Sequence, residues 1–262
     1  MSSQTADTQV ESNNVSIPKF FTKNINNLLG HFGYGFSKRR PAPKPEHFIR
    51  RQKLLETYNI DTLLDVGANI GQYSKRMRKH VHYNRRIISF EPMEKEFLTL
   101  SETAKSDPLW EVEHFALGNE NGTSEIQISG NSVSSSMLDM LPSVLDACTE
   151  KAAYVGKEAI TVKTLDSIFD QYCTQKNNIF LKIDTQGYER TVLEGALESL
   201  PHISGLQLEM SLMPFYKGEI LYNEMIDYVS SLGFKLMSME PALEDSKTGR
   251  QLQFDGVFFR EK

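Results

Sequence analysis

The sequence has few of the features that mark secreted, metal-binding or membrane-spanning proteins. Its 262 residues include two cysteines, Cys148 and Cys173, which are too few for a disulfide framework and lack metal-ligand spacing. No apolar run approaches the roughly 18 residues that a membrane span needs, and the polar start at Met1 does not resemble a signal peptide. These absences predict a cytoplasmic protein with reduced thiols and no metal site.

Positive charge is also scarce outside the first part of the chain. The net charge of −5 gives no general case for nucleic-acid binding. Residues 1–50 hold seven Lys/Arg and three Asp/Glu, a net charge of +4, so the remainder carries −9. We therefore divide the chain into an N-terminal segment, residues 1–47, and a main domain, residues 48–262.

The N-terminal segment begins with a polar tail and continues with a basic amphipathic pattern. Over residues 18–40, apolar side chains recur at helical spacing beside lysines and arginines. This pattern predicts a helix that packs on the main domain or on a second copy of the chain, which would make a homo-oligomer. The other interpretation is a helix that touches a membrane surface or a lipid-linked substrate.

The main domain alternates helical and strand patterns, which predicts a parallel, doubly wound α/β sheet. Strands are predicted at Thr62–Val66, Arg86–Phe90, Trp110–Ala116, Asn178–Asp184 and Ile203–Glu209, with Phe234–Met239 and Phe254–Arg260 as a final antiparallel pair. Helices are predicted at Arg50–Tyr58, Gln72–Lys79, Glu94–Lys105 and Tyr222–Leu232. An insertion around residues 124–163 has two alternating segments, Ser124–Ser129 and Ala159–Lys163, which predict a hairpin around a Ser-rich candidate lid.

The turn after the first predicted strand carries the most informative motif, Asp65-x-Gly67-x-x-x-Gly71. It lacks the Gly-x-Gly-x-x-Gly spacing of dinucleotide loops, and it begins with an acid that a diphosphate would avoid. Glu91 ends the second strand roughly 20 residues later, where a carboxylate can accept both ribose hydroxyl protons. A positively charged nucleoside without phosphate suits both the acid at the start of the loop and the ribose-binding carboxylate. The motif therefore predicts S-adenosylmethionine as cofactor.

The residues expected to contact this cofactor follow the loop and the ends of neighbouring strands. They are Asp65, Gly67, Ala68, Asn69, Gly71, Gln72, Tyr73, Glu91, Pro92, Ala116, Leu117, Asn119 and Asp184. A side chain at Gly67 or Gly71 would hold the backbone away from the ligand, and Asn69 tolerates a left-handed turn. A bland interpretation stays open, in which the glycines only form a tight turn, Glu91 is a solvated strand end and Asn119 belongs to a simple turn.

Six segments of the main domain form a recognisable pattern, in the order Asp65–Gly71, Phe90–Pro92, Ala116–Gly118, Leu181–Glu189, Leu193–Ala196 and Asp255–Phe258. Together they resemble the FkbM family of S-adenosylmethionine-dependent methyltransferases. The resemblance runs from about Leu54 to Arg260 and leaves the N-terminal segment outside it. It implies a class I methyltransferase fold, a Rossmann-like three-layer sandwich with a mostly parallel seven-stranded sheet and an antiparallel last strand. It also implies O-methylation of sugars or polyketide-type natural products. Many members have an acid where this chain has Gln186.

Methyl transfer to a hydroxyl needs an aligned acceptor and a group that takes its proton. Asp184 and Glu209 end the fourth and fifth strands, at the sheet edge where ligands of such folds bind. We predict Asp184 as general base or orienting group, with Glu209 as second choice. Asp184 could instead cap the following helix, and Glu209 could pair with Lys182 or face solvent. A metal held by both of them with Asp255 is the less favoured interpretation.

The sequence thus predicts an O-methyltransferase whose acceptor is a small molecule or saccharide, including a lipid-linked one. The alternatives are methylation of a polyketide-type product and a non-catalytic module that only binds the cofactor. N-methylation is less favoured, because Asp184-Thr185-Gln186-Gly187 stands where an Asp-Pro-Pro-Tyr type motif would be. The Ser-rich insertion and the N-terminal segment are expected to select the acceptor.

Overall fold

The structure is a computed structural model that describes residues 45–142 and 153–261. The predicted N-terminal amphipathic helix and Cys148 lie outside the described residues, as do residues 143–152 of the insertion. In the described ranges, no helix has both the length and the apolar character to cross a membrane.

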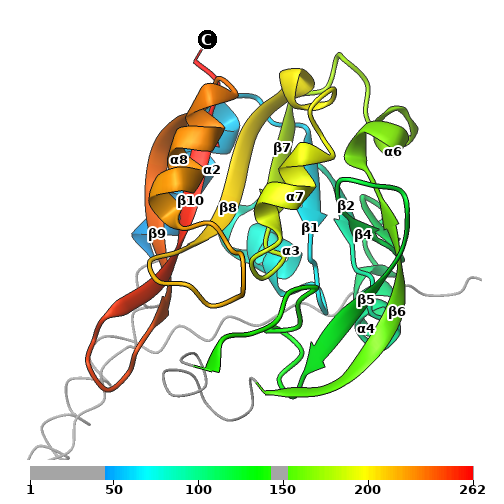
Figure 1. The fold of residues 1–262 in the computed structure, drawn as a ribbon. Helices are drawn as coiled ribbons and strands as arrows, with labels where there is room; N and C mark the ends of the chain where they lie inside the picture. Colours follow the sequence, from blue (N-terminus) through cyan, green and yellow to red (C-terminus); the bar gives the residue numbers. More distant parts are fainter. Residues whose placement is uncertain (1–44, 143–152, 262) are drawn as a thin grey trace, which may run out of the picture. The chain divides into compact units, whose positions relative to one another are not determined.

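The main domain is built on a seven-stranded sheet with strand order β3-β2-β1-β7-β8-β10-β9 (Figure 1). The strands are β1 (Thr62–Val66), β2 (Arg86–Phe90), β3 (Trp110–Glu113), β7 (Ile179–Ile183), β8 (Ile203–Ser211), β9 (Lys235–Glu244) and β10 (Gln251–Phe259). Pairs among β3, β2, β1, β7 and β8 are parallel, whereas β10 runs antiparallel to both β8 and β9. The mostly parallel sheet with an antiparallel last strand is therefore confirmed.

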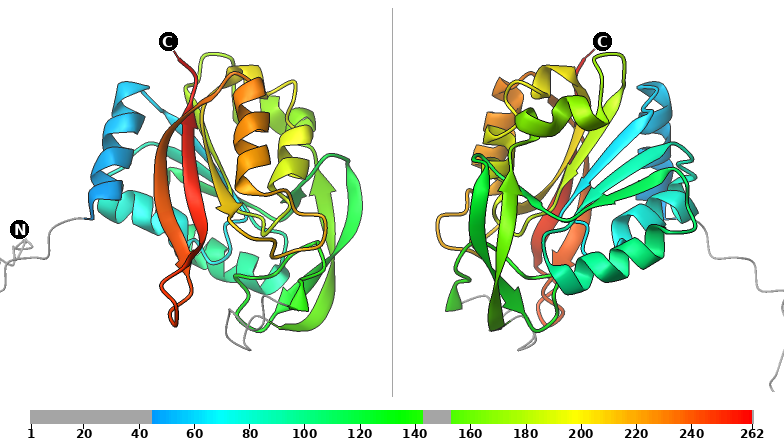
Figure 2. Two further views of the ribbon diagram at one scale, coloured as in Figure 1. Left: turned by 60° about the vertical axis from the view of Figure 1, so that its left-hand side comes forward. Right: turned by 90° about the vertical axis from the view of Figure 1, so that its right-hand side faces the viewer.

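Helices cover both faces of this sheet, which gives three layers (Figure 2). One face carries α2 (Glu46–Thr57), α3 (Gln72–Arg76), the π-helical turn Met77–Val81 and α4 (Glu94–Ala104). The other carries α6 (Leu165–Tyr172), α7 (Glu189–Glu194) and α8 (Tyr222–Ser231), with a short 3₁₀ turn at Leu200–His202. Of these, α6 and α7 have no counterpart among the four predicted helix ranges, although a helix after Asp184 is expected from the sequence. All five residues of β1 are buried, as expected for a central strand covered on both sides.

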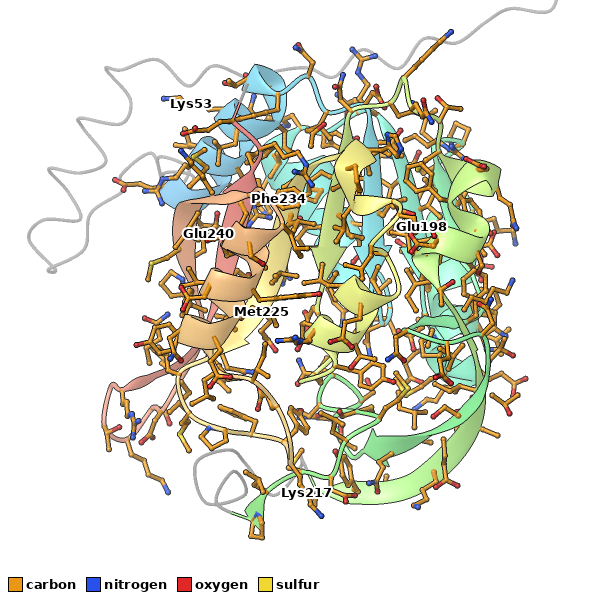
Figure 3. The ribbon with its side chains drawn as sticks, turned by 45° about the horizontal axis from the view of Figure 1, so that its top comes forward. Lys53, Glu198, Lys217, Met225, Phe234 and Glu240 are labelled. Carbon is orange, nitrogen blue, oxygen red and sulfur yellow. The ribbon has the colours of Figure 1, made fainter. Side chains whose placement is uncertain are left out.

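The hydrophobic core is divided by the sheet into two clusters. Neighbouring residues of β1 point to opposite faces, so Leu63 packs with α2, α3 and α4 while Leu64 packs with α6, α7 and α8. Met225 of α8 and Phe234, just before β9, belong to the second cluster (Figure 3). Packing on both faces fixes the strand ends, which is what positions the site described below.

The third strand differs from its prediction. The predicted strand Trp110–Ala116 is broken after Glu113, because Glu113 pairs with Phe90, the last residue of β2, and no neighbour remains to extend the main sheet. The chain then forms β4 (Ala116–Leu117), which joins a second sheet of order β4-β6-β5. There, β5 (Gly122–Ser129) and β6 (Tyr154–Lys163) are antiparallel, so the predicted hairpin is confirmed.

Candidate active site

Two adjoining cavities lie at the carboxyl ends of the parallel strands. The small cavity, about 200 Å³, lies at the ends of β1, β2 and β4 beside the Ser-rich insertion. The large cavity, about 670 Å³, lies at the ends of β7 and β8, between β9, β10 and α2. Five residues line both, namely Tyr73, Arg76, Val133, Asp184 and Gln186. The cavities therefore meet at the end of β7.

The turn after β1 owes its shape to backbone conformations that few side chains allow. Gly67, Asn69 and Gly71 have φ angles of 73°, 49° and 84°. A Cβ on Gly67 would lie 2.0 Å from the carbonyl oxygen of Asp184, so the two strand ends touch at this glycine. A Cβ on Gly71 would lie 2.8 Å from Cη2 of Trp110. Packing against Trp110, rather than approach to a ligand as predicted, therefore requires the second glycine.

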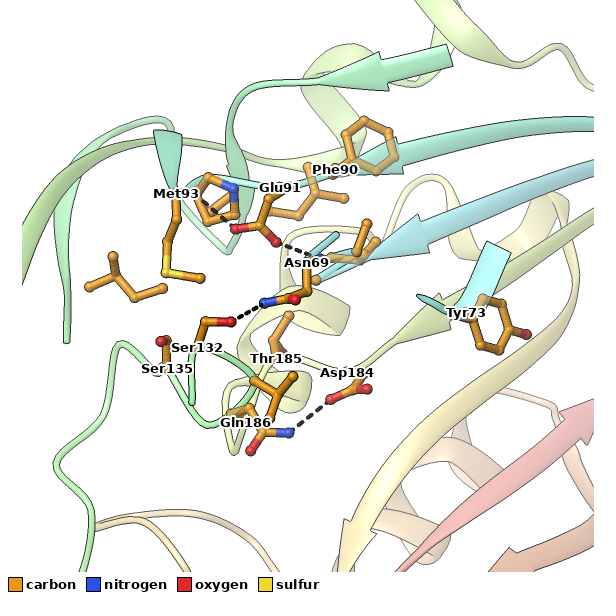
Figure 4. Close-up of a pocket in the computed structure, with 18 of the residues that line it drawn as sticks. Asn69, Tyr73, Phe90, Glu91, Met93, Ser132, Ser135, Asp184, Thr185 and Gln186 are labelled. Carbon is orange, nitrogen blue, oxygen red and sulfur yellow. Dashed lines mark hydrogen bonds between the residues drawn. The ribbon is translucent and has the colours of Figure 1, made fainter. Parts of the chain in front are cut away.

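Glu91 ties this turn to the end of β2 (Figure 4). Its side chain lines the small cavity, and the residue is only 2% exposed. The backbone N–H of Asn69 donates to Oε2 at 2.7 Å, and that of Met93 donates to Oε1 at 2.9 Å. Burial raises the pKa of Glu91 to about 7, although these two hydrogen bonds oppose the shift. The carboxylate is thus held in place but keeps accepting capacity.

The rest of the small cavity has an apolar wall and a polar rim. The apolar wall consists of Val66, Phe90, Met93, Leu117, Ile126 and Met137. On the rim, Nδ2 of Asn69 donates to Oγ of Ser132 at 3.2 Å, and Nε2 of Gln72 donates to Oδ1 of Asn69 at 2.9 Å. Ser132 and Ser135 of the Ser-rich insertion line the cavity, so the insertion contributes part of its boundary.

Asp65 lies behind the turn rather than in either cavity. The residue is 0% exposed, and its carboxylate accepts from Oγ of Ser74 at 2.7 Å and lies 3.0 Å from Nζ of Lys182. That Nζ also donates to the carbonyl oxygens of Val66 and Gly67, at 3.2 and 3.1 Å. Burial lowers the pKa of Lys182, but Asp65 and then Asp184 outweigh burial, so the pKa rises above its usual range. Asp65 therefore supports the loop through Lys182.

The large cavity is lined by a row of carboxylates on neighbouring strands. Asp255 of β10 is directly opposite Glu209 of β8 and Glu240 of β9, so the three side chains share one face of the sheet. Asp184 follows Ile183, which pairs with Leu208, and so stands beside Glu209. Burial raises the pKa of Glu209, with contributions from Asp184 and Asp255, and burial raises that of Asp255 to about 6.

A buried arginine offsets part of this negative charge. Nη2 of Arg51 lies 2.6 Å from Oε2 of Glu240, and Nη1 donates to the hydroxyl of Tyr73 at 2.9 Å and to Oε1 of Gln207. The Tyr73 hydroxyl also donates to Oε1 of Gln207, at 2.7 Å. These contacts fix α2 and α3 against the sheet beneath the large cavity.

The side-chain amide of Gln186 joins the two predicted catalytic residues. Its Nε2 donates to Oδ1 of Asp184 at 2.9 Å and to Oε2 of Glu209 at 2.7 Å. Oε2 of Glu209 also accepts from Nε2 of Gln253 at 3.0 Å. Asp184 and Glu209 therefore stand together at the junction of the cavities, and Glu209 accepts hydrogen bonds from two amides rather than pairing with Lys182.

Asp184 does not cap the following helix. The helix α7 begins at Glu189 and has no side-chain cap at Tyr188. The loop before it is organised by Glu189, whose Oε1 accepts from the backbone N–H groups of Thr185 at 2.7 Å and Gly187 at 3.2 Å. The carboxylate of Asp184 is therefore available to molecules that bind in the two cavities that it lines.

Most of the residues predicted to contact the cofactor line the small cavity. These are Gly67, Ala68, Asn69, Gln72, Tyr73, Glu91, Pro92, Ala116, Leu117 and Asp184. Three do not: Asp65 and Gly71 lie behind the loop, and Asn119 is exposed beyond β4. Prediction from the sequence missed Gln186, Gln207 and Gln253. The last two could have been found, because each lies two residues before an acid in a predicted strand and so shares its face.

Comparison with known proteins places these features in a family. The family model described as "Methyltransferase FkbM domain" matches residues 65–236, which is more than half of the chain. No protein with a curated description matches.

The solved structures that resemble the chain share little sequence with it. The FkbM methyltransferase of Methylobacillus flagellatus KT is 13% identical with a TM-score of 0.45; the match covers 76% of this chain and 44% of that one, less than half of its length. A SAM-dependent methyltransferase of Aquifex aeolicus is 13% identical with a TM-score of 0.40, and the match covers 94% of this chain and 100% of that one. The N-terminal domain of human METTL16, in complex with SAH, is 9% identical with a TM-score of 0.45, and the match covers 97% of this chain and 88% of that one. The family model, rather than these distant structures, decides the assignment: the chain belongs to the FkbM methyltransferase family.

Proposed function

We propose that the protein transfers a methyl group from S-adenosylmethionine to a hydroxyl of a saccharide. One observation carries this proposal: a cavity suited to a nucleoside and a cavity lined with carboxylates and amides meet at Asp184. A group transferred from one cavity to the other would pass this carboxylate. The family assignment makes a methyl group the transferred unit.

The small cavity fits this cofactor better than it fits a dinucleotide. The N–H groups of Gly67 and Ala68 both donate to the carbonyl oxygen of Phe90 at 3.1 Å, and that of Gly71 donates to Ala68 at 2.9 Å. The N–H of Asn69 is bound to Glu91. With these four donors used inside the protein, the turn offers no nest of N–H groups to a pyrophosphate. Glu91 suits ribose hydroxyls, and the apolar wall suits an adenine ring.

The protein's own part in the reaction is alignment and proton removal. When bound, the cofactor supplies an electrophilic methyl group on a positively charged sulfur. Asp184 orients the acceptor hydroxyl toward the small cavity and takes its proton. A carboxylate is a weak base toward an alcohol, so holding the two reactants together accounts for most of the acceleration.

The large cavity supplies the polar contacts that a saccharide needs. Glu209, Gln207, Gln253 and Asp255 line it from adjacent strands, and they offer both donors and acceptors to hydroxyl groups. A polyketide-type acceptor, with fewer hydroxyls, would form fewer hydrogen bonds with these side chains. The row of amides and carboxylates therefore favours a hydroxyl-rich acceptor.

Calorimetry and a labelling assay test the proposal in two separate steps. Glu91→Gln should weaken S-adenosylmethionine binding by roughly tenfold or more, whereas Glu102→Gln, an exposed change on α4, should leave it unchanged. Asp184→Asn should bind the cofactor but slow transfer by about 10²- to 10⁴-fold.

The acceptor is then sought with methyl-labelled cofactor and fractionated cell glycans and lipids. Label in the glycan fraction supports the proposal. Label in protein or nucleic acid, or binding of the cofactor without transfer to any fraction, would contradict it and favour another acceptor class or a binding module.

A further inference from the structure

Gln186 occupies the junction of the two cavities and lines both of them. Figure 4 shows its side chain reaching from the loop after β7 toward Asp184. An amide nitrogen carries two hydrogens, and here each has its own carboxylate, Oδ1 of Asp184 at 2.9 Å and Oε2 of Glu209 at 2.7 Å. One side chain thus spans the two residues that the sequence singles out for catalysis.

The orientation of this amide is fixed from the opposite side. The hydroxyl of Tyr216 donates to Oε1 of Gln186 at 2.8 Å. Tyr216 is 2% exposed, and burial raises its pKa, so the phenol keeps the proton that it donates. Oγ of Ser136 donates to the backbone carbonyl oxygen of Gln186 at 2.6 Å, which anchors the residue that carries the amide. A flipped amide would turn its oxygen toward two carboxylates and its nitrogen toward a donor, so the observed orientation is the favourable one.

We propose that Gln186 is a positioning residue, which holds Asp184 and Glu209 as a pair and aims Asp184 at the acceptor hydroxyl. The proposal rests on the proposed function for the identity of the acceptor group, but the pairing itself does not depend on it. Two ionised carboxylates side by side repel each other, and a donor that stands between them offsets part of this repulsion. Gln186 is that donor, and it adds no charge of its own.

The charged groups around Asp184 and Glu209 do not take over the role of Gln186. Nζ of Lys182 is 3.7 Å from Oδ2 of Asp184 but is bound to Asp65 and to two loop carbonyls. On the remaining sides, Glu189 of α7 and Asp255 of β10 add negative charge near Glu209. Further along the row, Arg51 of α2 is occupied by Glu240 of β9, and Tyr73 of α3 hydrogen-bonds Gln207. The surroundings are therefore acidic, and a neutral donor between the two carboxylates reduces their repulsion.

The decisive variant is Gln186→Glu, which keeps the shape and replaces the donor with a third carboxylate. Carbon-13 NMR of glutamate-labelled protein without ligands follows the titration of Glu209, assigned by its loss in Glu209→Gln. The midpoint should move up by about one pH unit or more in Gln186→Glu. The matched variant is Gln253→Glu, at a side chain that hydrogen-bonds Oε2 of Glu209 but not Asp184. Gln253→Glu should also raise the midpoint of the Glu209 titration.

Transfer kinetics then separate the two variants. Gln186→Glu should lower kcat about tenfold at pH 7 and regain it at higher pH, because the third carboxylate opposes ionisation of the pair. Gln253→Glu should lower kcat less than Gln186→Glu does, and it should shift the pH dependence of kcat by a smaller amount. Gln186→Met, which removes both hydrogen bonds without adding charge, should lower kcat, move the rate profile to higher pH by less than Gln186→Glu does, and leave the KM for S-adenosylmethionine unchanged.

Each outcome decides the inference. An unchanged Glu209 titration in folded Gln186→Glu, or equal rate profiles for Gln186→Glu and Gln253→Glu, would overturn it. If Gln186→Glu does not fold, a wild-type kcat in Gln186→Met has the same meaning. A shifted titration in a protein that transfers no methyl group supports the pairing by Gln186 while it refutes the proposed function.

Discussion

The small and large cavities adjoin, yet they are built by different parts of the chain. The small cavity is shaped by backbone: a turn with left-handed residues whose N–H groups are bound within the protein, and a buried carboxylate that holds it. The large cavity is shaped by side chains that neighbouring strands bring into register. We therefore expect changes behind the small cavity to affect folding, and changes along the carboxylate row to affect chemistry at little cost in stability.

The strongest test of this difference is Lys182→Met, which removes the cation behind the small cavity. Asp65 would then be a buried, unpaired charge, and the loop carbonyls of Val66 and Gly67 would lose their donor. Breaking a buried pair on one side costs about 3–5 kcal/mol of unfolding free energy. Urea unfolding at pH 7 measures it. The exposed pair Lys105–Glu102 is the control, and Lys105→Met should change the unfolding free energy by less than about 0.5 kcal/mol.

A second test concerns the turn itself. Gly67→Ala would place a methyl group 2.0 Å from the carbonyl oxygen of Asp184 at a φ of 73°, and both the contact and the conformation are unfavourable. We expect a loss of about 3 kcal/mol. Gly122→Ala, with nothing within 4 Å of the added Cβ and no positive φ, should change stability far less. Equal losses in the two variants would remove the argument that backbone geometry builds the small cavity.

The same difference explains what the sequence could and could not predict. The small cavity follows from local order along the chain: strand, glycine turn, helix, strand and acid. Glu91, Asn69 and Gln72, which this order predicts as cofactor residues, line the small cavity. Asp65 and Gly71, predicted with them, do not line the cavity, because what lies behind the turn depends on Lys182 and Trp110, which come from distant segments.

The large cavity depends on contacts that local patterns do not contain. Glu209, Asp255 and Glu240 become neighbours only through the order β8-β10-β9 and its register. The break after Glu113 has a similar cause, because the length of β2 ends the pairing of β3. Strand existence could be predicted from periodicity, whereas strand register required the folded sheet.

The third test uses the titration of Glu91. Its pKa is raised to about 7, so between about pH 4.5 and 7 the folded protein holds a proton that the unfolded chain has lost. Stability should therefore fall as pH rises through this window and level off above it. Glu91→Gln removes this contribution, which we expect to be on the order of 2 kcal/mol. Unfolding curves at pH 5 and 8 measure it, and parallel pH dependences of wild type and variant would contradict it.

The smallest change in unfolding free energy is expected for Asp255→Asn in the carboxylate row. The informative result is whether this substitution stabilises or destabilises the protein. Burial raises the pKa of Asp255 to about 6, so ionising it costs stability as pH rises past the unfolded value near 4. Asp255→Asn removes that cost but also loses the attraction to Arg51, so we expect a net gain of about 1 kcal/mol at pH 8 that vanishes near pH 4. The transfer rate should fall at the same time if the row binds the acceptor.

Asp245, in the turn between β9 and β10, provides the opposite case for comparison. Hydrogen bonds from Thr248 and Lys247 lower its pKa, so Asp245→Asn should lose stability at pH 8 and approach wild type as pH falls. A carboxylate that a fold keeps for stability and one that it keeps for chemistry should thus respond to the same substitution with opposite signs. If Asp255→Asn instead destabilises the protein at pH 8, the row holds the sheet together, and the separation of chemistry from stability in the large cavity fails.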